Sequence, residues 1–298
     1  MSWLALIAGA GVLSAAALPI YQEAKRSPTP DASPKAKLSR GETYYRWYGP
    51  DNGPVAVCVH GLSTPSIAYH EFAQNMALLG FRVLVYDLYG RGASDAPRGR
   101  QTPAFFERQL LDLLADQGLD RDITLIGYSM GGSIAAHVAA ENPERFREVV
   151  LLAPAGMGEE LGRMARLCAR VPVLGDWLFS LLYPQHLLAG IKSDSSAPPA
   201  VLRHQEAELQ RRGFIRSVLS SLRGTLNRPL EKTHRKLAET GLPVTAVWGQ
   251  VDTVIPLRSM GTLVQWNRNA HQIVIDGAGH GLPYTHALDV VEHLLDEE

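Results

Sequence analysis

The chain has few cysteines and no excess of either charge. Its 298 residues include two cysteines, Cys58 and Cys168, each within an apolar run, and no Cys or His spacing typical of a metal site. We therefore expect two buried thiols rather than a disulfide, with no metal and no cofactor. The formal net charge of −1 argues against nucleic acid as a partner.

The amino terminus lacks the positive charge that usually opens a secretory signal peptide. Residues 3–20 are uncharged and mostly apolar, about the length that crosses a bilayer, and basic residues follow from Lys25 onward. This pattern predicts membrane attachment through an uncleaved single-pass anchor, with the rest of the chain in the cytoplasm. Two alternatives stay open. One is a signal peptide cleaved near Ala15 and Ala17, leaving a secreted or periplasmic protein, and the other is a helix docked on a soluble protein.

A strand, a sharp turn and a helix follow one another in residues 123–140. The apolar run from Ile123 stops at Gly127, Ser129 comes two residues later, and a helical pattern begins at once. Glycines at 127 and 131 suit a turn in which strand and helix pass too close for a Cβ. Such a turn exposes the serine hydroxyl to a general base and to backbone donors for an oxyanion. The five-residue motif alone is a weak signal, so its partners must come from elsewhere in the chain.

The segments before this turn alternate between strand and helix patterns. Apolar runs at 55–59 and 81–86 each lead into a glycine-punctuated loop and then a helical segment. This alternation predicts an α/β fold with a mostly parallel β-sheet flanked by helices. Loops after parallel strands gather at one edge of the sheet. His60 lies in one of these loops, and we interpret it as bracing the loop rather than as a base.

These motifs resemble those of the α/β-hydrolases of the serine lipase and esterase type, monoacylglycerol-lipase-like with a cap domain. The resemblance covers about residues 43–294. It rests on His60-Gly61, on the loop 87–95, on the Gly127–Gly131 turn and on two carboxyl-terminal motifs. It implies an acid and a histidine after the serine, in that order.

Both residues are present after predicted strands. Asp252 follows the run 243–248, and His280 stands in a glycine-rich loop after the run 271–275. We predict a catalytic triad of Ser129, Asp252 and His280. His280 would take the Ser129 proton during attack on a carbonyl carbon, and Asp252 would hold the imidazole in the correct tautomer.

Other residues compete weakly for these roles. His271 and His286 stand at a strand start and within a helical segment, where no glycine-rich loop would direct them. Asp87 has a smaller claim to the place of the acid, because some relatives carry their acid after an earlier strand. Its other interpretation is a cap on its own loop through backbone amides.

Backbone amides beside the serine complete the predicted site. The amides of Leu62 and Met130 would form the oxyanion hole. Tyr128, next to the serine, and Trp177, in an apolar helical stretch, are predicted to contact substrate.

About 85 residues without strand patterns separate the run 149–153 from the strand at Val244. In the family that the chain resembles, a cap domain over the serine occupies this place. We therefore divide the chain into an N-terminal hydrophobic anchor (1–22), a Pro-rich linker (23–40), an α/β-hydrolase core (41–154 and 240–298) and a helical cap (155–239).

The resemblance implies a serine hydrolase that cleaves carboxylic esters of apolar acyl groups through an acyl-enzyme. The expected partner is a small, lipophilic ester, and the oligomeric state stays open. The first alternative is a carbon–carbon bond hydrolase or an acyltransferase that uses the same triad. A more remote alternative is a non-catalytic interaction scaffold, which would have no need of all three triad residues.

Overall fold

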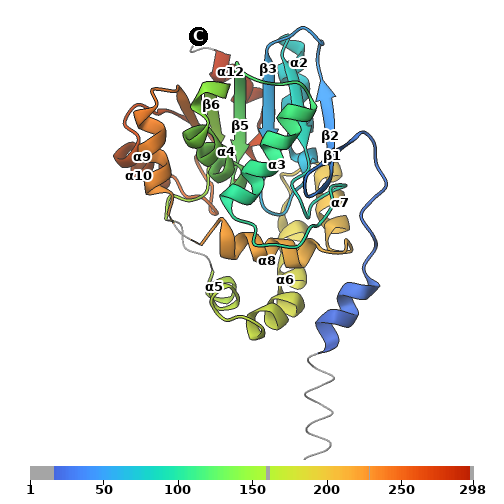
Figure 1. Cartoon of the computed structure of the whole chain (residues 1–298). Helices are drawn as coiled ribbons and strands as arrows, with labels where there is room; N and C mark the ends of the chain where they lie inside the picture. The colour runs from blue at the N-terminus through green and yellow to red at the C-terminus, as the bar shows by residue number, and fades with distance from the viewer. Residues whose placement is uncertain (1–16, 159–161, 228, 296–298) are drawn as a thin grey trace, which may run out of the picture.

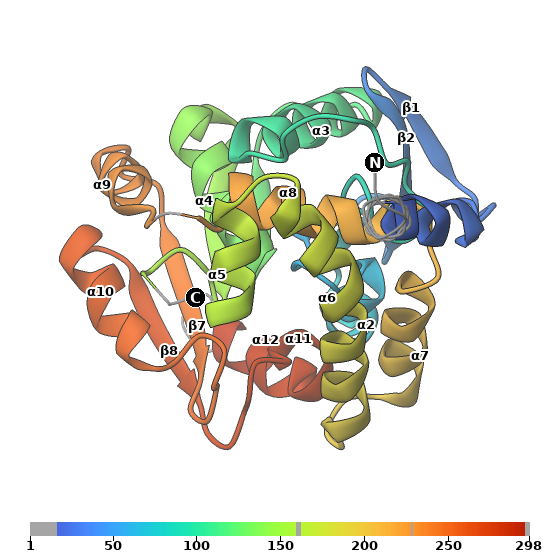
Figure 2. The ribbon, with the colours of Figure 1, turned by 90° about the horizontal axis from the view of Figure 1, so that it is seen from below.

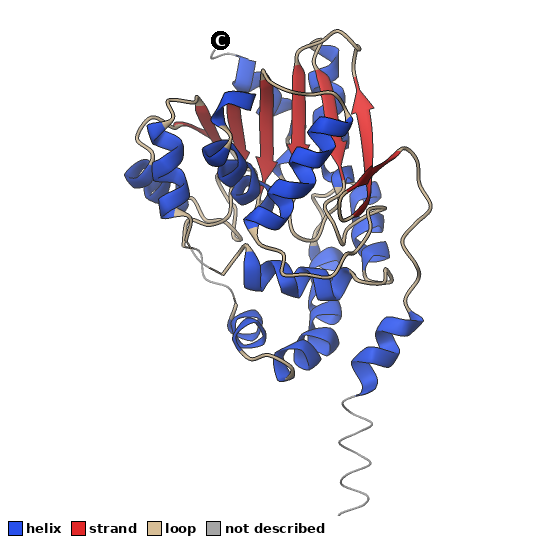
Figure 3. Ribbon diagram, in the orientation of Figure 1, coloured by secondary structure: helices blue, strands red, loops and turns tan. Residues whose placement is uncertain are grey.

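A single β-sheet forms the centre of the computed structural model, which describes residues 17–158, 162–227 and 229–295. Eight strands of these residues lie in the order β1-β2-β4-β3-β5-β6-β7-β8. Strands β4, β3, β5, β6, β7 and β8 are parallel, whereas β1 and β2 are antiparallel to their neighbours. The predicted α/β fold with a mostly parallel sheet is therefore confirmed (Figure 3). The strands are β1 (Lys35–Leu38), β2 (Gly41–Tyr48), β3 (Val55–Val59), β4 (Arg82–Tyr86), β5 (Ile123–Tyr128), β6 (Phe146–Leu152), β7 (Val244–Gly249) and β8 (His271–Ile275).

Helices cover both faces of the sheet, and alternate strand residues are buried under each layer. In β3, Val57 and Val59 pack with α3, α4 and α10, whereas Ala56 and Cys58 pack with α2 and α12. A strand buried on both faces needs apolar residues at every position, which explains its continuous apolar sequence. The core helices are α2 (His70–Leu78), α3 (Pro103–Asp116), α4 (Met130–Glu141), α10 (Arg258–Trp266), α11 (Leu282–Thr285) and α12 (Ala287–Leu295), with 3-10 turns η1 (Ser66–Tyr69) and η2 (Pro143–Arg145).

Four of the five described helices between β6 and β7, here called the helical insertion, lie beyond the carboxyl ends of the parallel strands (Figures 1 and 2). They are α5 (Arg163–Arg170), α6 (Leu174–Ser193), α7 (Pro199–Glu208) and α8 (Phe214–Gly224). An apolar cluster that includes Cys168, Phe179 and Phe214 holds α5, α6 and α8 together. The next helix, α9 (Glu231–Glu239), packs on α4 and α10 instead. The division of the chain into a core and a cap at 155–239 stays a prediction.

The segment before β1 packs on the helical insertion. Residues 17–25 are helical, and the Ser27 backbone then donates to the Gln210 carbonyl at 2.7 Å and accepts from the Arg212 amide at 2.8 Å. Arg26 donates through Nε to the Leu209 carbonyl at 3.2 Å. Glu23 accepts from the Gly213 amide.

The predicted membrane localisation is corrected by this arrangement. Most of the expected span, residues 1–16, lies outside the described residues. Within the described part of the chain, no helix combines the length and the apolar character needed to cross a bilayer. The prediction of a single-pass anchor that places the protein in a membrane is therefore wrong. The polar residues that follow the apolar stretch bond to the insertion, a contact that hydropathy does not reveal.

Candidate active site

Ser129 lies at the turn between β5 and α4 in a conformation that is unusual for a non-glycine residue. Its φ is +54° and its ψ is −118°. Three backbone hydrogen bonds hold this conformation: its amide donates to the Leu152 carbonyl at 2.9 Å, and its carbonyl accepts from Gly132 at 2.9 Å and from Ala155 at 3.0 Å. A Cβ on Gly131 would overlap the Val59 carbonyl oxygen. The turn thus needs its second glycine because α4 passes directly against β3.

The three predicted triad residues lie within hydrogen-bond distance of one another. His280 Nε2 lies 3.0 Å from Ser129 Oγ, and His280 Nδ1 lies 2.8 Å from Asp252 Oδ2. An ionised carboxylate can only accept hydrogen bonds, so Nδ1 carries the proton and Nε2 is left to accept from the serine hydroxyl. This is the arrangement in which the imidazole can take the serine proton.

The Asp252 side chain is fully buried, and both of its carboxylate oxygens accept hydrogen bonds. Its Oδ1 accepts from the amides of Val254 at 2.7 Å and Ile255 at 2.8 Å, while Oδ2 faces His280. A buried carboxylate is stable only where hydrogen bonds replace its lost hydration. The same bonds keep its second oxygen aimed at the imidazole.

His60 braces two loops and has no nitrogen left for proton transfer. Its Nε2 accepts from the Leu88 amide at 2.9 Å, and its Nδ1 therefore donates to the Gly61 carbonyl at 2.9 Å. Burial lowers the pKa of His60 to about 3. A neutral imidazole thus ties the loop after β3 to the loop after β4, in agreement with the structural interpretation.

Asp87 caps its own loop and does not contact His280. Its carboxylate accepts from the amides of Ser66 and Ala93, each at 2.8 Å. Burial raises its pKa, and the two amides oppose that effect. The structure thus places this acid in the loop-capping role, and Asp252 at the histidine.

Of the two other histidines considered for the base, His271 lies at a strand start as expected, whereas His286 lies in the bend between α11 and α12 and not within a helix. His271 is exposed at the start of β8, whereas His280 follows the other end of that strand. His286 lies beside Thr285, whose Oγ1 is 2.9 Å from its Nδ1. Within the described residues, the histidine that lies within hydrogen-bond distance of Ser129 Oγ is His280.

The predicted oxyanion-hole residues flank Ser129 on both sides. A Cβ on Gly61 would lie 3.4 Å from the Ser129 Cβ, so the loop that carries Leu62 runs directly beside the serine. Met130 is the first residue of α4. Neither the Leu62 amide nor the Met130 amide donates a hydrogen bond within the described residues. Their role stays a prediction.

A cavity of about 930 Å³ opens over Ser129 and His280, between the sheet edge and the helical insertion. Tyr128 lines it, whereas Trp177 of α6 does not, and the substrate contacts of both residues stay predictions. Tyr284 of α11, which the sequence did not single out, also lines it. The two tyrosine rings pack edge to face at 6.3 Å, and burial raises the pKa of Tyr284 to about 12. The one sequence signal for Tyr284 was its position shortly after His280.

The cavity wall is mainly apolar and carries little charge. Its described lining includes the acidic Asp194 but no arginine or lysine. Aliphatic side chains come from both the core and the insertion: Leu62, Leu187, Ile191, Leu222, Leu226, Val254 and Ile255. Uncharged polar groups come from Ser63, Thr64, His186, Ser196, Gln205, Thr253, Thr285 and His286.

The fold is that of an α/β-hydrolase. A family model described as serine aminopeptidase, S33 (Hydrolase_4) matches residues 51–284, so the chain belongs to this family of α/β-hydrolases. A 2-hydroxy-6-oxononadienedioate/2-hydroxy-6-oxononatrienedioate hydrolase from Cupriavidus pinatubonensis is 26% identical over 262 residues, which cover 83% of this chain and 88% of that protein.

Two solved structures share the fold at lower identity. The enol-lactonase from Burkholderia xenovorans superposes with a TM-score of 0.71 at 21% identity, covering 88% of this chain and 98% of that one. A thermophilic esterase from Thermogutta terrifontis gives a TM-score of 0.69 at 20% identity, covering 89% and 97%. At these identities the likeness establishes the fold alone.

Proposed function

We propose that this chain is a serine hydrolase that cleaves carboxylic esters of apolar acyl groups. The observation that carries the proposal is the continuous chain of hydrogen bonds from Ser129 Oγ through His280 to Asp252, with lengths of 3.0 Å and 2.8 Å. A serine hydroxyl is a weak nucleophile, and a base within hydrogen-bond reach is what activates it.

In the acylation step, Ser129 Oγ attacks the ester carbonyl carbon while His280 Nε2 takes its proton. The buried Asp252 carboxylate stabilises the imidazolium that forms. The Leu62 and Met130 amides stabilise the negative oxygen of the tetrahedral intermediate. Collapse of this intermediate breaks the bond to the alcohol, which leaves with the proton from Nε2.

Water completes the reaction by the same route. His280 takes a proton from a water molecule as that water attacks the acyl-enzyme carbonyl, and then returns a proton to Ser129 Oγ as the carboxylic acid departs. Neither acylation nor deacylation changes an oxidation state, so neither step needs a redox partner. In each step the acyl carbon exchanges one oxygen substituent for another, and His280 transfers the proton.

The composition of the cavity wall supports an uncharged, apolar acyl group. Its aliphatic lining would bury a hydrocarbon chain. A dicarboxylate would find no arginine or lysine among the described lining residues, and Asp194 would repel it.

A carbon–carbon bond hydrolase is the second candidate, favoured by the named activity of the Cupriavidus pinatubonensis relative. That substrate is a dioate, which fits poorly in a cavity whose described wall is mainly apolar and carries Asp194. Parallel assays of a p-nitrophenyl ester series and of a 2-hydroxy-6-oxo dienedioate would separate the two candidates. We expect turnover of esters and little or none of the dioate; the opposite ranking would favour the second candidate.

The direct test is labelling by a fluorophosphonate, with the adduct mapped by peptide mass spectrometry. We expect the adduct on Ser129 and its loss in a His280→Ala variant. Ser63→Ala is the matched control, because Ser63 lines the same cavity but has no histidine partner among the triad bonds. Labelling that persists without His280, or that follows Ser63, would contradict the assignment.

A further inference from the structure

A fully buried arginine, Arg91, lies in the loop between β4 and α3. Its Nε donates to the Leu62 carbonyl at 3.0 Å. Its terminal nitrogens donate to the Tyr89 carbonyl at 3.0 Å, to Gln101 Oε1 at 2.6 Å and to Ser221 Oγ at 2.9 Å. All four acceptors are uncharged oxygens. A buried cation is stable only where hydrogen bonds replace its hydration, so these four bonds fix the orientation of the guanidinium.

The carbonyls on either side of the Leu62 amide are both held by buried side chains. The Gly61 carbonyl accepts from His60 Nδ1 at 2.9 Å, and the Leu62 carbonyl accepts from Arg91. The Gly61 carbonyl and the Leu62 N–H belong to one planar trans peptide and therefore point in opposite directions. The bond from His60 thus sets the direction of this N–H, and the bond from Arg91 fixes the peptide that follows.

The direction of the Leu62 N–H matters because this residue lies beside the nucleophile. Leu62 lines the cavity over Ser129, and a Cβ on the preceding Gly61 would lie 3.4 Å from the Ser129 Cβ. A backbone donor stabilises an oxyanion only if it is aimed at the position that the negative oxygen will occupy. Arg91 is not among the described residues that line this cavity. It therefore acts on this peptide without touching the substrate.

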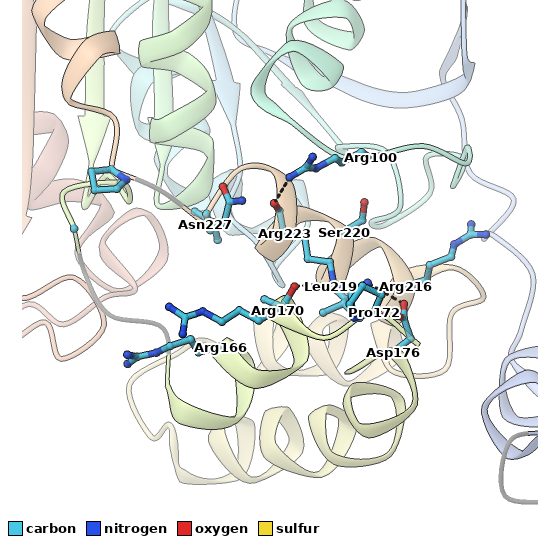
Figure 4. Close-up of a pocket in the computed structure, with 15 residues that line it drawn as sticks. Arg100, Arg166, Arg170, Pro172, Asp176, Arg216, Leu219, Ser220, Arg223 and Asn227 are labelled. Atoms are coloured by element: carbon cyan, nitrogen blue, oxygen red, sulfur yellow. Dashed lines mark hydrogen bonds and ion pairs between the residues drawn. The ribbon is translucent and has the colours of Figure 1, made fainter. Parts of the chain in front are cut away.

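The other end of the Arg91 guanidinium binds the helical insertion. Ser221 of α8 accepts from Arg91 and donates to Gln101 Oε1 at 2.6 Å, so three buried side chains form one polar cluster. The carboxyl end of α8 is bonded to the same part of the core, because Arg100 donates to the Arg223 carbonyl at 3.1 Å (Figure 4). Arg91 thus connects a fixed point on the insertion with the loop that carries Leu62.

We propose that Arg91 is a positioning residue for the oxyanion hole, which holds Leu62 so that its amide faces the developing negative oxygen. The inference rests on the proposed ester hydrolysis, since it gives Arg91 a part in that reaction. Arginine suits this task because its Nε and terminal nitrogens lie in one rigid plane. Fixing one end of that plane on Ser221 fixes the direction in which Nε donates to Leu62. A lysine has a single ammonium on a flexible chain and cannot bind both oxygens in this way.

The test compares substrate with a tetrahedral inhibitor in an Arg91→Lys variant. An alkyl trifluoromethyl ketone adds to an active-site serine and places its negative oxygen in the oxyanion hole. We expect its Ki to rise about 10²-fold and kcat for a p-nitrophenyl ester to fall by a similar factor. KM should stay within about twofold, because the contact forms only in the transition state. A merely structural role would lower the amount of active enzyme and leave Ki unchanged.

A second variant removes the support on the insertion and leaves Arg91 in place. Ser221→Ala should raise Ki and lower kcat by about fivefold, the effect of one hydrogen bond. Ser220→Ala is the matched control on the same helix. The Ser220 hydroxyl accepts from the Gln101 amide at 3.0 Å and lines a different cavity (Figure 4). We expect both constants of this control to stay within about twofold of the parent.

The outcomes separate this inference from the proposed function. Raised Ki values in Arg91→Lys and Ser221→Ala, with Ser220→Ala unchanged, support the positioning role. An unchanged Ki in folded Arg91→Lys overturns it while the ester hydrolysis of the parent stands. If Arg91→Lys does not fold, Ser221→Ala decides alone, and a Ki equal to that of Ser220→Ala overturns the inference. A parent that neither hydrolyses esters nor binds the ketone contradicts the proposed function, and the positioning role falls with it.

Discussion

His280 Nδ1 lies 2.8 Å from Asp252 Oδ2, and the two residues follow adjacent parallel strands of the sheet. Strands β7 and β8 are in register up to the pair Gly249 and Ile275. The loops that follow β7 and β8 therefore start at the same edge of the sheet. Asp252 and His280 lie only a few residues into these loops, so their side chains meet. The sheet register, rather than nearness in sequence, sets this hydrogen bond.

Asp252→Asn should lower kcat for a short-chain p-nitrophenyl ester by about 10⁴-fold. An amide can offer its NH₂ group to His280 and so favour the tautomer that leaves Nε2 protonated, which cannot accept the Ser129 proton. Steady-state kinetics at neutral pH measures the effect. A loss of less than about tenfold would remove Asp252 from the role of the acid.

Asp87→Asn should instead lower stability while most of the activity remains. The Asp87 carboxylate accepts from two backbone amides, and an asparagine can accept from only one of them. We expect a loss of about 1–3 kcal/mol in the free energy of unfolding, measured by denaturant titration. If this variant lost activity as Asp252→Asn does, the two acids would exchange roles.

Ser129→Ala should abolish ester turnover with little effect on stability. The Ser129 side chain is partly exposed, and its hydroxyl bonds to His280 rather than to the core. We expect the free energy of unfolding to change by no more than about 0.5 kcal/mol. An endpoint assay with a long incubation measures the residual ester hydrolysis. Hydrolysis retained by the Ser129→Ala variant would show that another residue is the nucleophile.

Gly131→Ala should destabilise the protein by about 1–3 kcal/mol and also reduce activity, because the added Cβ meets the Val59 carbonyl oxygen. Gly261→Ala is the matched control. Gly261 lies within α10, where an added Cβ would have nothing within 4 Å, so we expect about 0.5–1 kcal/mol of stabilisation. Thermal unfolding of the two variants should therefore shift in opposite directions, and equal shifts would contradict the close contact of α4 with β3.

His234→Leu should make the stability less sensitive to acid. His234 of α9 is fully buried beside Trp266, and neither ring nitrogen has a partner within the described residues. Burial lowers its pKa to about 4, against about 6.5 in the unfolded chain. Below pH 6.5 the unfolded chain takes up a proton that the folded chain refuses, so stability falls as the pH falls toward 4.

The His234→Leu variant has no imidazole at this position to take up a proton on unfolding. Over that pH range its free energy of unfolding should therefore fall less than that of the parent, by up to about 3 kcal/mol. His60, with a pKa lowered in the same direction, is present in both proteins. The difference between the two unfolding curves at pH 8 and pH 5 therefore isolates His234. Parallel changes in both proteins with pH would show that the position is not a buried, neutral histidine.

Local patterns in the sequence determined the strand order along the chain and the residues of the candidate site. Each depends on short-range chemistry. Apolar runs form buried strands, glycines at 127 and 131 permit the close turn, and Ser129, Asp252 and His280 each follow such a strand. The resemblance to α/β-hydrolases then predicted Ser129 as the nucleophile, Asp252 as the acid and His280 as the base before any contact between them was known.

The amino-terminal prediction failed because it depended on the apolar stretch by itself. The hydropathy of a segment indicates how readily it would move from water into a bilayer. It contains no information about the residues to which neighbouring polar side chains are hydrogen-bonded. Here Glu23 and Arg26 bond to residues of the helical insertion that lie far away in the sequence.

Only the tertiary structure decided which side chains share a cavity. Tyr284 of α11 reaches the cavity wall beside Tyr128 of β5, and Leu187 of α6 lines the same cavity, because the strand register and the packing of the insertion bring distant segments together. In sequence these residues belong to unrelated elements with no shared periodicity. Contacts of this kind depend on the sum of many packing interactions, and therefore a local pattern cannot encode them.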